Sequence, residues 1–513
     1  MIAWQDGYVS DIEYMPGFYR EQMPVHLDTV CMLRNIEPPV TPGAPYRYCE
    51  LGCGVGETSL AVAAANHSSE VWGFDFNPAH IARGRELAKR SGLKNIRLEE
   101  ASFEQLATND PFGLPAFDYI TLHGVWSWIS MENRAHIIRF IDRTLKPGGV
   151  AYVSYNALPG WTQSVPTQRL LAMLAKSENT HSDVRISKTL DMVRRISDAG
   201  SPALPVEILE SLKKERDKGN VAYLAHEYLN EHWAPCYQTD VAEDFAVAKM
   251  EFVGSANLLE NFPDLSLKAE QRAIIEEVPH SLRETVGDYF MTRTFRRDVF
   301  MRGARTVPRH VRENRLRQQK LKLVIPPSAA HREIKIPLGE ATLNEGFYGP
   351  ALRALSKGPC TIGELLDLPE AEGSTASPRE IMGMLIGSHQ AMALINPVTK
   401  ETVEAARLYN AAHLAECADN ERIVTALMAP AVGSAVTVTV LEMLAYESLV
   451  AGTPAEAGAL AQASAKLLLE RGAKLHQKGE QLESDDETMR TLRENMDKII
   501  SISLPIWQSL GAI

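Results

Sequence analysis

Tyr48-Cys-Glu-Leu-Gly-Cys-Gly-Val-Gly-Glu57 (YCELGCGVGE) is the stretch that decides the fold. Its first residues have the pattern of a buried strand, and Gly52, Gly54 and Gly56 follow before a helical pattern begins. Glycines leave backbone N–H groups unhindered, and the N-terminus of a helix attracts the anionic or polar parts of a ligand. The stretch therefore predicts a strand, a glycine turn and a helix that together bind a nucleotide-like ligand.

Two other nucleotide-binding turns do not match these glycines. A Walker phosphate loop requires Gly-Lys followed by Ser or Thr, and no such triplet follows here. The dinucleotide fingerprint G-x-G-x-x-G needs a glycine three residues after Gly54, where the chain has Glu57. What remains is a G-x-G-x-G pattern that follows an acidic residue, Glu50.

The sequence around this turn alternates between strand and helix patterns. Strands are expected at 46–51, 71–75, 96–100, 118–122 and 150–155, and helices at 58–66, 78–91 and 130–145. This alternation predicts an α/β fold in which helices cover both faces of a parallel sheet. Two further strand patterns, at 250–255 and 293–301, are expected to pair antiparallel at one edge of the same sheet.

Two features beyond the glycine turn support a ligand-binding sheet. Asp75 ends the second expected strand, 23 residues after Gly52, where a carboxylate can accept hydrogen bonds from both hydroxyls of a ribose. Gly148 and Gly149 supply a tight corner before the fifth strand. A sheet without a cofactor would not require all of these features together.

The G-x-G-x-G turn after Glu50 resembles motif I of the class I S-adenosylmethionine-dependent methyltransferases. Further segments resemble bacterial members that carry a methyltransferase regulatory domain: GYVSDIEYMPGFYRE (7–21), HGVWSWIS (123–130), VSYNALPGW (153–161), YLAHEYLNEHWAPCY (223–237) and FVGSANLLENFP (252–263). This group includes rickettsial lysine methyltransferases that act on outer-membrane proteins. The resemblance implies a Rossmann-like sheet, S-adenosyl-L-methionine as cofactor, S-adenosyl-L-homocysteine as product, and no metal.

The resemblance and the strand ends together identify candidate cofactor-binding residues. They are Tyr14, Tyr19, Glu50, Gly52, Cys53, Gly54, Asp75, Phe76, Ala101, Ser102, Phe103 and His123. Cys53 is expected as a small turn residue and not as a nucleophile, since no paired base is evident. Glu50 is expected either to hold the glycine loop or to bind the ligand's ammonium group. Ser102 occupies a position where the family commonly has Asp.

Aromatic residues are expected at the methyl-accepting end of the cleft. Candidate catalytic residues, near the ends of the fourth and fifth strands, are His123, Trp126, Trp128, Tyr155, Asn156 and Trp161. Aromatic faces attract a cationic amine by ~0.5–2 kcal/mol per contact. Packing of the tryptophans between helices and sheet is the alternative. Other residues that either line the cleft or serve packing and capping are Tyr8, Tyr14, Phe18, Tyr19, His226, His232 and Trp233.

Three functions are compatible with these features. The resemblance favours N-methylation of protein lysine side chains. The same cleft would serve methylation of a small molecule, such as a small amine, or of a peptide. The third is a non-catalytic regulator that binds S-adenosylmethionine or, through the basic stretch 302–322, nucleic acid. The net charge of −12 disfavours nucleic acid as the main binding partner.

The chain of 513 residues is too long for one core and is expected to contain several domains. The expected units are a cofactor-binding domain (1–165), a helical insertion (166–219), a region that completes the sheet (220–305), a linker with a winged-helix-like unit (306–400) and a helical domain (401–513). By the resemblance, the insertion would form a homodimer, and its stripe Leu170, Leu171 and Leu174 needs a partner surface.

Composition suggests the compartment. The six cysteines form no CxxC pair and match no zinc spacing, which is typical of reduced thiols in a cytoplasmic protein. The N-terminus carries acidic residues where a signal peptide needs a basic start, and no apolar stretch is suited to span a membrane. We therefore expect a cytoplasmic protein without a membrane partner.

Overall fold

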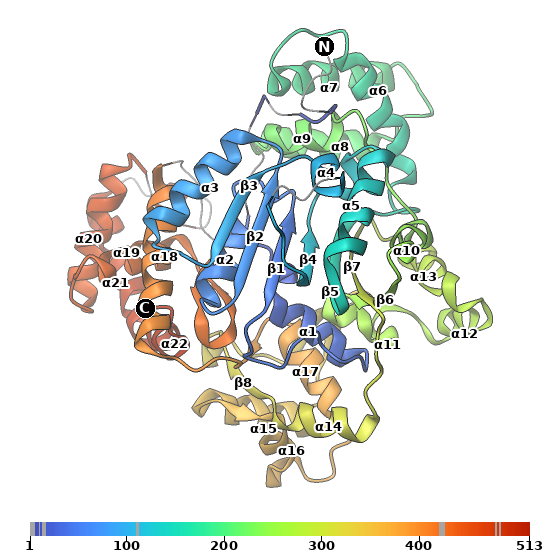
Figure 1. The fold of residues 1–513 in the computed structure, drawn as a ribbon. Helices are drawn as coiled ribbons and strands as arrows, with labels where there is room; N and C mark the ends of the chain where they lie inside the picture. The colour runs from blue at the N-terminus through green and yellow to red at the C-terminus, as the bar shows by residue number, and fades with distance from the viewer. Residues whose placement is uncertain are drawn as a thin grey trace.

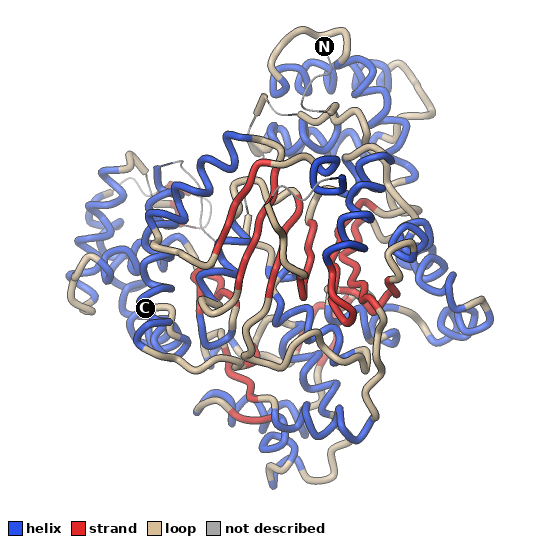
Figure 2. The backbone as a smooth tube through the Cα atoms, viewed as in Figure 1, coloured by secondary structure: helices blue, strands red, loops and turns tan. Residues whose placement is uncertain are grey.

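The computed structural model describes residues 6–9, 11–12, 17–108, 112–419, 426–473, 475–477, 480–481 and 484–513. A seven-stranded sheet forms its centre, with the strand order β3-β2-β1-β4-β5-β7-β6 (Figures 1 and 2). The strands are β1 Arg47–Leu51, β2 Glu70–Asp75, β3 Ile96–Glu100, β4 Phe117–Leu122, β5 Leu145–Asn156, β6 Met250–Ser255 and β7 Phe295–Arg302. The predicted α/β fold is confirmed.

The first five strands are parallel, and the last two run differently. β7 pairs antiparallel with β5, and β6 pairs antiparallel with β7 at the edge of the sheet. The pairing predicted for 250–255 and 293–301 is therefore confirmed. The insertion between β5 and β6 contains α6 Val165–Ala175, α7 Ser182–Asp198, α8 Val206–Asp217, α9 Val221–Tyr228 and α10 Gln238–Ala246.

Alternation along the central strands builds a core on each face of the sheet. Tyr48 of β1 packs in one core with α1 Pro24–Leu33, whereas the next residue, Cys49, packs in the other with α5 Met131–Thr144. This is the period of two that a doubly covered sheet requires. The remaining helices beside the parallel strands are α2 Glu57–Ala65, α3 Pro78–Arg90 and α4 Phe103–Thr108.

The chain after β7 packs directly against the sheet domain. A three-stranded sheet in the order β11-β8-β12 has helices around it, and its apolar residues join the core that contains α1. The elements of this region are α14 Arg309–Gln318, β8 Lys320–Leu323, β9 Glu333–Ile336, β10 Gly339–Thr342, α15 Glu345–Lys357, β11 Cys360–Thr361, α16 Ile362–Leu366, α17 Pro378–Gly387 and β12 Ala391–Ala393. The winged-helix character of this region and the domain boundaries stay predictions.

The last region packs beside α2 and α3 (Figure 1). Glu416 of α18 accepts hydrogen bonds from Arg83 and Arg90 of α3. The elements are α18 Lys400–Asp419, β13 Ala426–Ala429, β14 Ser434–Thr437, α19 Val440–Val450, α20 Ala457–Glu470, α21 Asp485–Lys498 and α22 Leu504–Leu510. The hairpin β13–β14 lies where the sequence pattern predicted helix alone.

The α-helices between β6 and β7 are α11 Pro263–Ser266, α12 Ala269–Glu277 and α13 Arg283–Met291. Within the described part of the chain, no helix combines the length and apolar character needed to cross a bilayer.

Candidate functional site

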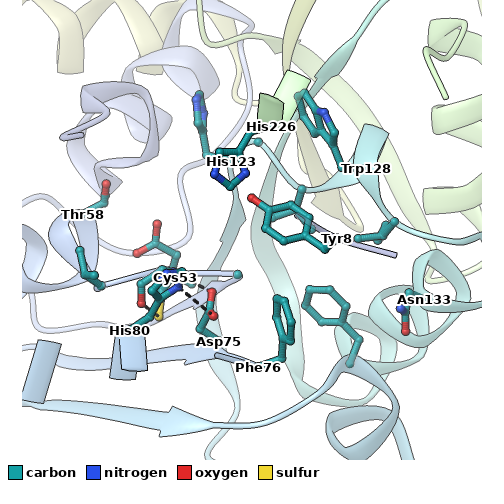
Figure 3. Close-up of a pocket in the computed structure, with 18 of the residues that line it drawn as sticks. Tyr8, Cys53, Thr58, Asp75, Phe76, His80, His123, Trp128, Asn133 and His226 are labelled. Carbon is teal, nitrogen blue, oxygen red and sulfur yellow. Dashed lines mark hydrogen bonds and ion pairs between the residues drawn. The ribbon is translucent and has the colours of Figure 1, made fainter. Parts of the chain in front are cut away.

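A cavity of about 220 Å³ opens at the carboxyl ends of β1, β2 and β4. Ligands of open parallel sheets bind at this edge. Figure 3 shows Cys53, Asp75 and His80 on one side of the cavity and Tyr8 and Trp128 on the other. Every predicted cofactor residue within the described ranges lines this cavity, and Tyr14 lies outside those ranges.

The glycine turn between β1 and α2 forms the floor of the cavity. Gly52, Gly54 and Gly56 all have positive φ angles, of 68°, 56° and 79°, which residues with a Cβ rarely adopt. A Cβ on Gly52 would lie 2.6 Å from Cγ2 of Val125. The backbone N–H of Cys53 donates to the carbonyl of Phe74 at 2.9 Å, which ties the turn to β2. Burial raises the pKa of the Cys53 thiol, so this side chain stays neutral.

Asp75 joins the glycine turn to the end of β2. Its Oδ2 accepts a hydrogen bond from the backbone N–H of Gly54, and its Oδ1 accepts one from that of Asn77, both at 2.9 Å. Nδ1 of His80 lies 3.4 Å from Oδ1. Each carboxylate oxygen has further lone pairs, so Asp75 can still accept the hydroxyls of a ribose in the cavity.

Glu50 and Gln22 lie at the inner end of the cavity. Oε2 of Glu50 accepts hydrogen bonds from the backbone N–H and the hydroxyl of Ser59, at 3.0 and 2.5 Å, and its Oε1 accepts one from Nε2 of Gln22 at 3.2 Å. Burial raises the pKa of Glu50 to about 7. Glu50 thus holds the start of α2. It also lines the cavity, and its binding to a ligand's ammonium group stays a prediction.

The amide oxygen of Gln22 tests whether this cavity fits S-adenosylmethionine. Gln22 is fully buried, and its Nε2 is directed to Glu50 and Thr58. Its Oε1 has no hydrogen-bond partner among the described residues, although buried polar atoms normally have one. An ammonium group in the cavity would supply the missing donor, so the residues present fit an amino-acid-bearing nucleoside.

His123 forms the wall of the cavity after β4. Its Nδ1 and the hydroxyl of Tyr152 are 2.8 Å apart, and the ring of Tyr19 stacks on its ring with centroids separated by 3.8 Å. Burial lowers the pKa of His123 to about 3, so the imidazole is neutral at physiological pH. A neutral ring stacked in this way can position a ligand by packing, and it adds no charge to the cavity wall.

The wall after β3 contains Ala101, Ser102 and Phe103. The hydroxyl of Ser102 accepts a hydrogen bond from the backbone N–H of Gln105, and the side-chain carbonyl of Gln105 accepts one from the backbone N–H of Ser102. These bonds begin α4. Ser102 therefore serves as a helix cap at the position where the family commonly has Asp.

Asp6 and Tyr8 line the cavity, and contacts from α9 and the residues just after it hold Tyr8 and Val9 in place. The Tyr8 ring contacts Phe76 and His226, with centroids 6.0 and 5.6 Å apart. Oδ1 of Asn230 accepts a hydrogen bond from the backbone N–H of Val9 at 2.8 Å. His226 and Asn230 line the cavity, whereas His232 and Trp233 are not among its lining residues.

The three tryptophans occupy different environments. Trp128 lines the cavity and is 9% exposed. Trp126 is fully buried in the core beside Phe245, and its indole N–H donates to none of the residues that the structure describes. Trp161 packs edge-on against Trp233, and its indole N–H donates to the carbonyl of Thr294. Of the three, the structure places Trp128 alone at the cavity.

Tyr155 and Asn156 lie behind the cavity wall. The hydroxyl of Tyr155, which is fully buried, donates to Oδ2 of Asp298 at 2.6 Å. Nδ2 of Asn156 donates to Oε1 of Glu227 at 2.6 Å. Neither residue lines the cavity, but Asn156 positions a carboxylate that does.

Sequence reasoning missed Glu227, although it lies in the quoted segment YLAHEYLNEHWAPCY. Both Asn156 and the indole of Trp233 donate to its Oε1, whereas its Oε2 accepts no hydrogen bond from any described residue. Burial raises the pKa of Glu227. Gln22 was missed as well, because a single polar residue before the first strand carries no motif.

Comparison with known proteins identifies the family. A methyltransferase domain model matches residues 43–218, and a model described as a predicted methyltransferase regulatory domain matches residues 220–302. An uncharacterised protein of Synechocystis sp. is 32% identical over 523 residues, which span 99% of this chain and all of that protein. The chain belongs to the class I S-adenosylmethionine-dependent methyltransferases with a regulatory domain.

The fold of this methyltransferase recurs in a solved structure. PKMT2 from Rickettsia typhi, in complex with AdoHcy, superimposes with a TM-score of 0.67 at 18% identity, over 96% of this chain and 98% of that one. An uncharacterised protein of Rickettsia prowazekii is 30% identical over 224 residues, which cover 43% of the methyltransferase and 87% of that protein. The glycine turn and Asp75 lie within the matched methyltransferase domain, and α9 lies within the matched regulatory domain.

Proposed function

We propose that this methyltransferase transfers a methyl group from S-adenosylmethionine to the side-chain amine of lysine in a protein substrate. The observation that supports this acceptor is that Trp128 and Glu227 line the same cavity. Asn156 connects them, since its side chain donates to Glu227 and its backbone N–H donates to Ser127, the residue before Trp128. An aromatic face attracts an amine with cationic character, and a carboxylate accepts its hydrogen bonds. The resemblance to rickettsial lysine methyltransferases agrees with this acceptor.

The cofactor takes the end of the cavity built by the glycine turn. Asp75 accepts hydrogen bonds from the ribose hydroxyls, and Oε1 of Gln22 accepts one from the ammonium group. Tyr8, Phe76, Ala101, Ser102 and Phe103 surround the remainder of the cofactor. When bound, S-adenosylmethionine supplies a methyl group already activated on a sulfonium, so the chain must mainly align the acceptor and exclude water.

Glu227 receives the acceptor's proton. Formation of the new nitrogen–methyl bond requires a nitrogen lone pair, so an ammonium group must first lose a proton. Oε2 of Glu227 accepts it, because Asn156 and Trp233 already occupy Oε1 and burial makes this carboxylate more basic. Trp128 lines the same cavity, where its ring can pack against the aliphatic chain that carries the nitrogen.

Incubation of the full chain with methyl-labelled cofactor and a bacterial lysate tests this function. We expect label in protein, recovered as methyllysine after hydrolysis. Glu227→Gln and Trp128→Ala should each lower transfer about 10- to 100-fold while cofactor affinity changes little. Asp75→Ala is the matched control that lowers both. Label confined to the small-molecule fraction would reject the protein acceptor and favour a small amine.

We further propose that the helical insertion forms a homodimer. The predicted stripe packs inward, since Leu171 is fully buried and Leu170 and Leu174 are partly buried in the insertion's own core. Other apolar side chains of α6, α7 and α8 are exposed: Met173, Val184, Met192, Ile196 and Val206. A second copy would cover them. Light scattering should give twice 56.8 kDa, and a monomer mass at micromolar concentration would reject the dimer.

A further inference from the structure

A second cavity, of about 310 Å³, lies at the opposite edge of the sheet, beside the amino ends of β1 and β2. Seven segments of the described chain build it: α1, the loop before β1, the end of α2 with the loop to β2, Gln319, Met382 of α17, the stretch 393–402, and the turn at Pro430. We call it the amino-edge cavity. It joins the methyltransferase domain to both later regions of the chain.

Asp28 gives this cavity its chemistry. Its Oδ1 accepts a hydrogen bond from the hydroxyl of Tyr119 at 2.7 Å, whereas its Oδ2 accepts none from any described residue. Asp28 is half-buried, and its burial raises the pKa of the carboxyl to about 7, while none of the described lysines and arginines forms a salt bridge with it. A partly desolvated carboxylate with an open oxygen favours a ligand that can donate a hydrogen bond to it.

A second unpaired group lines the same cavity. Tyr46 is 8% exposed, and its buried hydroxyl makes no hydrogen bond of ordinary length with a described residue, although the side chain of Ser69 interacts with it. Burial raises the pKa of Tyr46, and the nearby carboxylate of Asp28 raises it further. Buried hydroxyls normally make a full hydrogen bond, so this hydroxyl and the open oxygen of Asp28 favour a ligand with hydrogen-bond donors.

The rest of the lining selects the charge of that ligand. The lining includes Asp28, Glu401 and His67, and none of the described lysines and arginines belongs to it. Apolar side chains, such as those of Val25, Met32 and Met382, supply the remaining surface. An anion would meet carboxylates without a cation, whereas an ammonium ion on an apolar body matches both kinds of surface.

The amino-edge cavity is connected to the cofactor cavity by a short rigid path. The single-turn helix η1 Arg20–Gln22 leads through Met23 directly into α1. Gln22 donates to Glu50 in the cofactor cavity, and Pro24, Val25 and Asp28 line the amino-edge cavity. A ligand that holds α1 in place therefore also holds Gln22. The second ligand then binds a segment that is already ordered, and its binding costs less conformational entropy.

We propose that the amino-edge cavity is a regulatory site for a small organic ammonium ion, paired with Asp28, whose binding increases the affinity for the cofactor. The ammonium group donates to Oδ2 of Asp28 and to the hydroxyl oxygen of Tyr46. The apolar body of the ion contacts the side chains that line the walls. Because the two cavities are reciprocally linked, the cofactor increases the affinity for the ammonium ion by the same factor.

Calorimetry on the full chain with cyclohexylammonium, cyclohexanol and cyclohexanecarboxylate tests the site. At about pH 8 the amine keeps its proton, and it should bind at least about tenfold more tightly than the alcohol, with the carboxylate weakest. Asp28→Asn keeps an acceptor for Tyr119 and should remove this preference without changing the affinity for cyclohexanol. Asp217→Asn, which alters an exposed carboxylate on α8, is the matched control.

A second measurement locates the ion and tests regulation. Saturating cyclohexylammonium should tighten binding of S-adenosylhomocysteine about three- to tenfold in the unaltered protein and leave it unchanged in Asp28→Asn. Equal affinities for the three probes would overturn the site. Amine binding that survives in Asp28→Asn but is lost in Trp128→Ala would place the ion at the acceptor end and overturn it too. Binding at Asp28 without any effect on S-adenosylhomocysteine would overturn the regulatory role.

Discussion

The cavities at the two edges of the sheet are built in different ways. The cofactor cavity rests on one continuous strand–turn–helix segment, in which positive φ angles at Gly52, Gly54 and Gly56 shape the floor. The amino-edge cavity has no such segment, because its walls come from residues as distant in sequence as Asp28 and Pro430. A site made by backbone rules leaves a motif in the sequence, whereas a site made by packing does not.

The largest expected effect distinguishes a tryptophan that packs in the core from one that lines the cofactor cavity. Trp126→Ala should destabilise the protein by ~3–5 kcal/mol, because it opens a hole in a fully buried core. Trp128→Ala should cost less stability and should instead reduce methyl transfer, because its ring lines the cavity. Thermal melts and turnover of both variants provide the check.

The two tryptophans are matched controls for each other, since they lie two residues apart in the same short helix, Trp126–Trp128. Equal loss of melting temperature in both variants, with transfer lost in proportion, would mean that Trp128 also serves packing. The aromatic wall of the acceptor site would then be rejected.

The second prediction concerns the carboxylate that joins β1 to β2. Asp75→Ala should weaken cofactor binding by ~1–3 kcal/mol, the scale of hydrogen bonds to a charged group. The backbone N–H groups of Gly54 and Asn77 lose their acceptor as well, so Asp75→Asn, which keeps one acceptor oxygen, is the control. Unchanged affinity in calorimetry for Asp75→Ala would remove this residue from the ribose site.

The sequence was sufficient for the sheet and the cofactor end of the cavity because both follow from local rules. Periodicity gave the strands, and the bare turn at Gly52 and Gly54 has few other uses. Periodicity failed at β13–β14, where Ala-rich strands such as Ala426–Ala429 resemble helix. There the short-range pairing with Ser434–Thr437 decides the conformation.

The acceptor end could not be predicted to the same depth. Residues two apart in a helix of three residues per turn point in different directions, so the sequence could not show which of Trp126 and Trp128 faces the cavity. Glu227 reaches the site through a hydrogen bond from Asn156, 71 residues earlier in the chain. Contacts over such separations arise from tertiary packing and have no local signal.

The third prediction uses the raised pKa of Glu50. Its pKa rises from 4.5 to about 7 on folding because the carboxyl is buried. The stability that Glu50 contributes is therefore fully present below pH 4.5 and is lost as the pH rises through about 7, by about 1.4 kcal/mol for each pH unit between these values. If the ionised carboxylate pairs with the cofactor's ammonium group, cofactor affinity should rise over the same pH window.

Calorimetry with S-adenosylhomocysteine across this window measures the effect. Glu50→Gln cannot ionise, so its affinity should be independent of pH between the two values. A pH dependence that persists unchanged in Glu50→Gln would assign the titration to another group and leave Glu50 with the sole role of holding α2.

The smallest expected effect compares two tyrosines on one face of the sheet, at the amino-edge cavity and beyond it. The hydroxyl of Tyr48 lies 2.6 Å from that of Thr121, and both residues are fully buried. Tyr48→Phe leaves Thr121 without this partner and should cost ~0.5–1.5 kcal/mol of stability. Tyr46→Phe removes a hydroxyl that makes no hydrogen bond of ordinary length with a described residue, so the ligand-free protein should keep or slightly gain stability. Denaturant titration of both variants measures the difference, and cyclohexylammonium should then stabilise Tyr46→Phe less than the unaltered protein.

A loss of stability in Tyr46→Phe equal to that in Tyr48→Phe would mean that the Tyr46 hydroxyl is already paired in solution, and the amino-edge cavity would lose one of its two open groups.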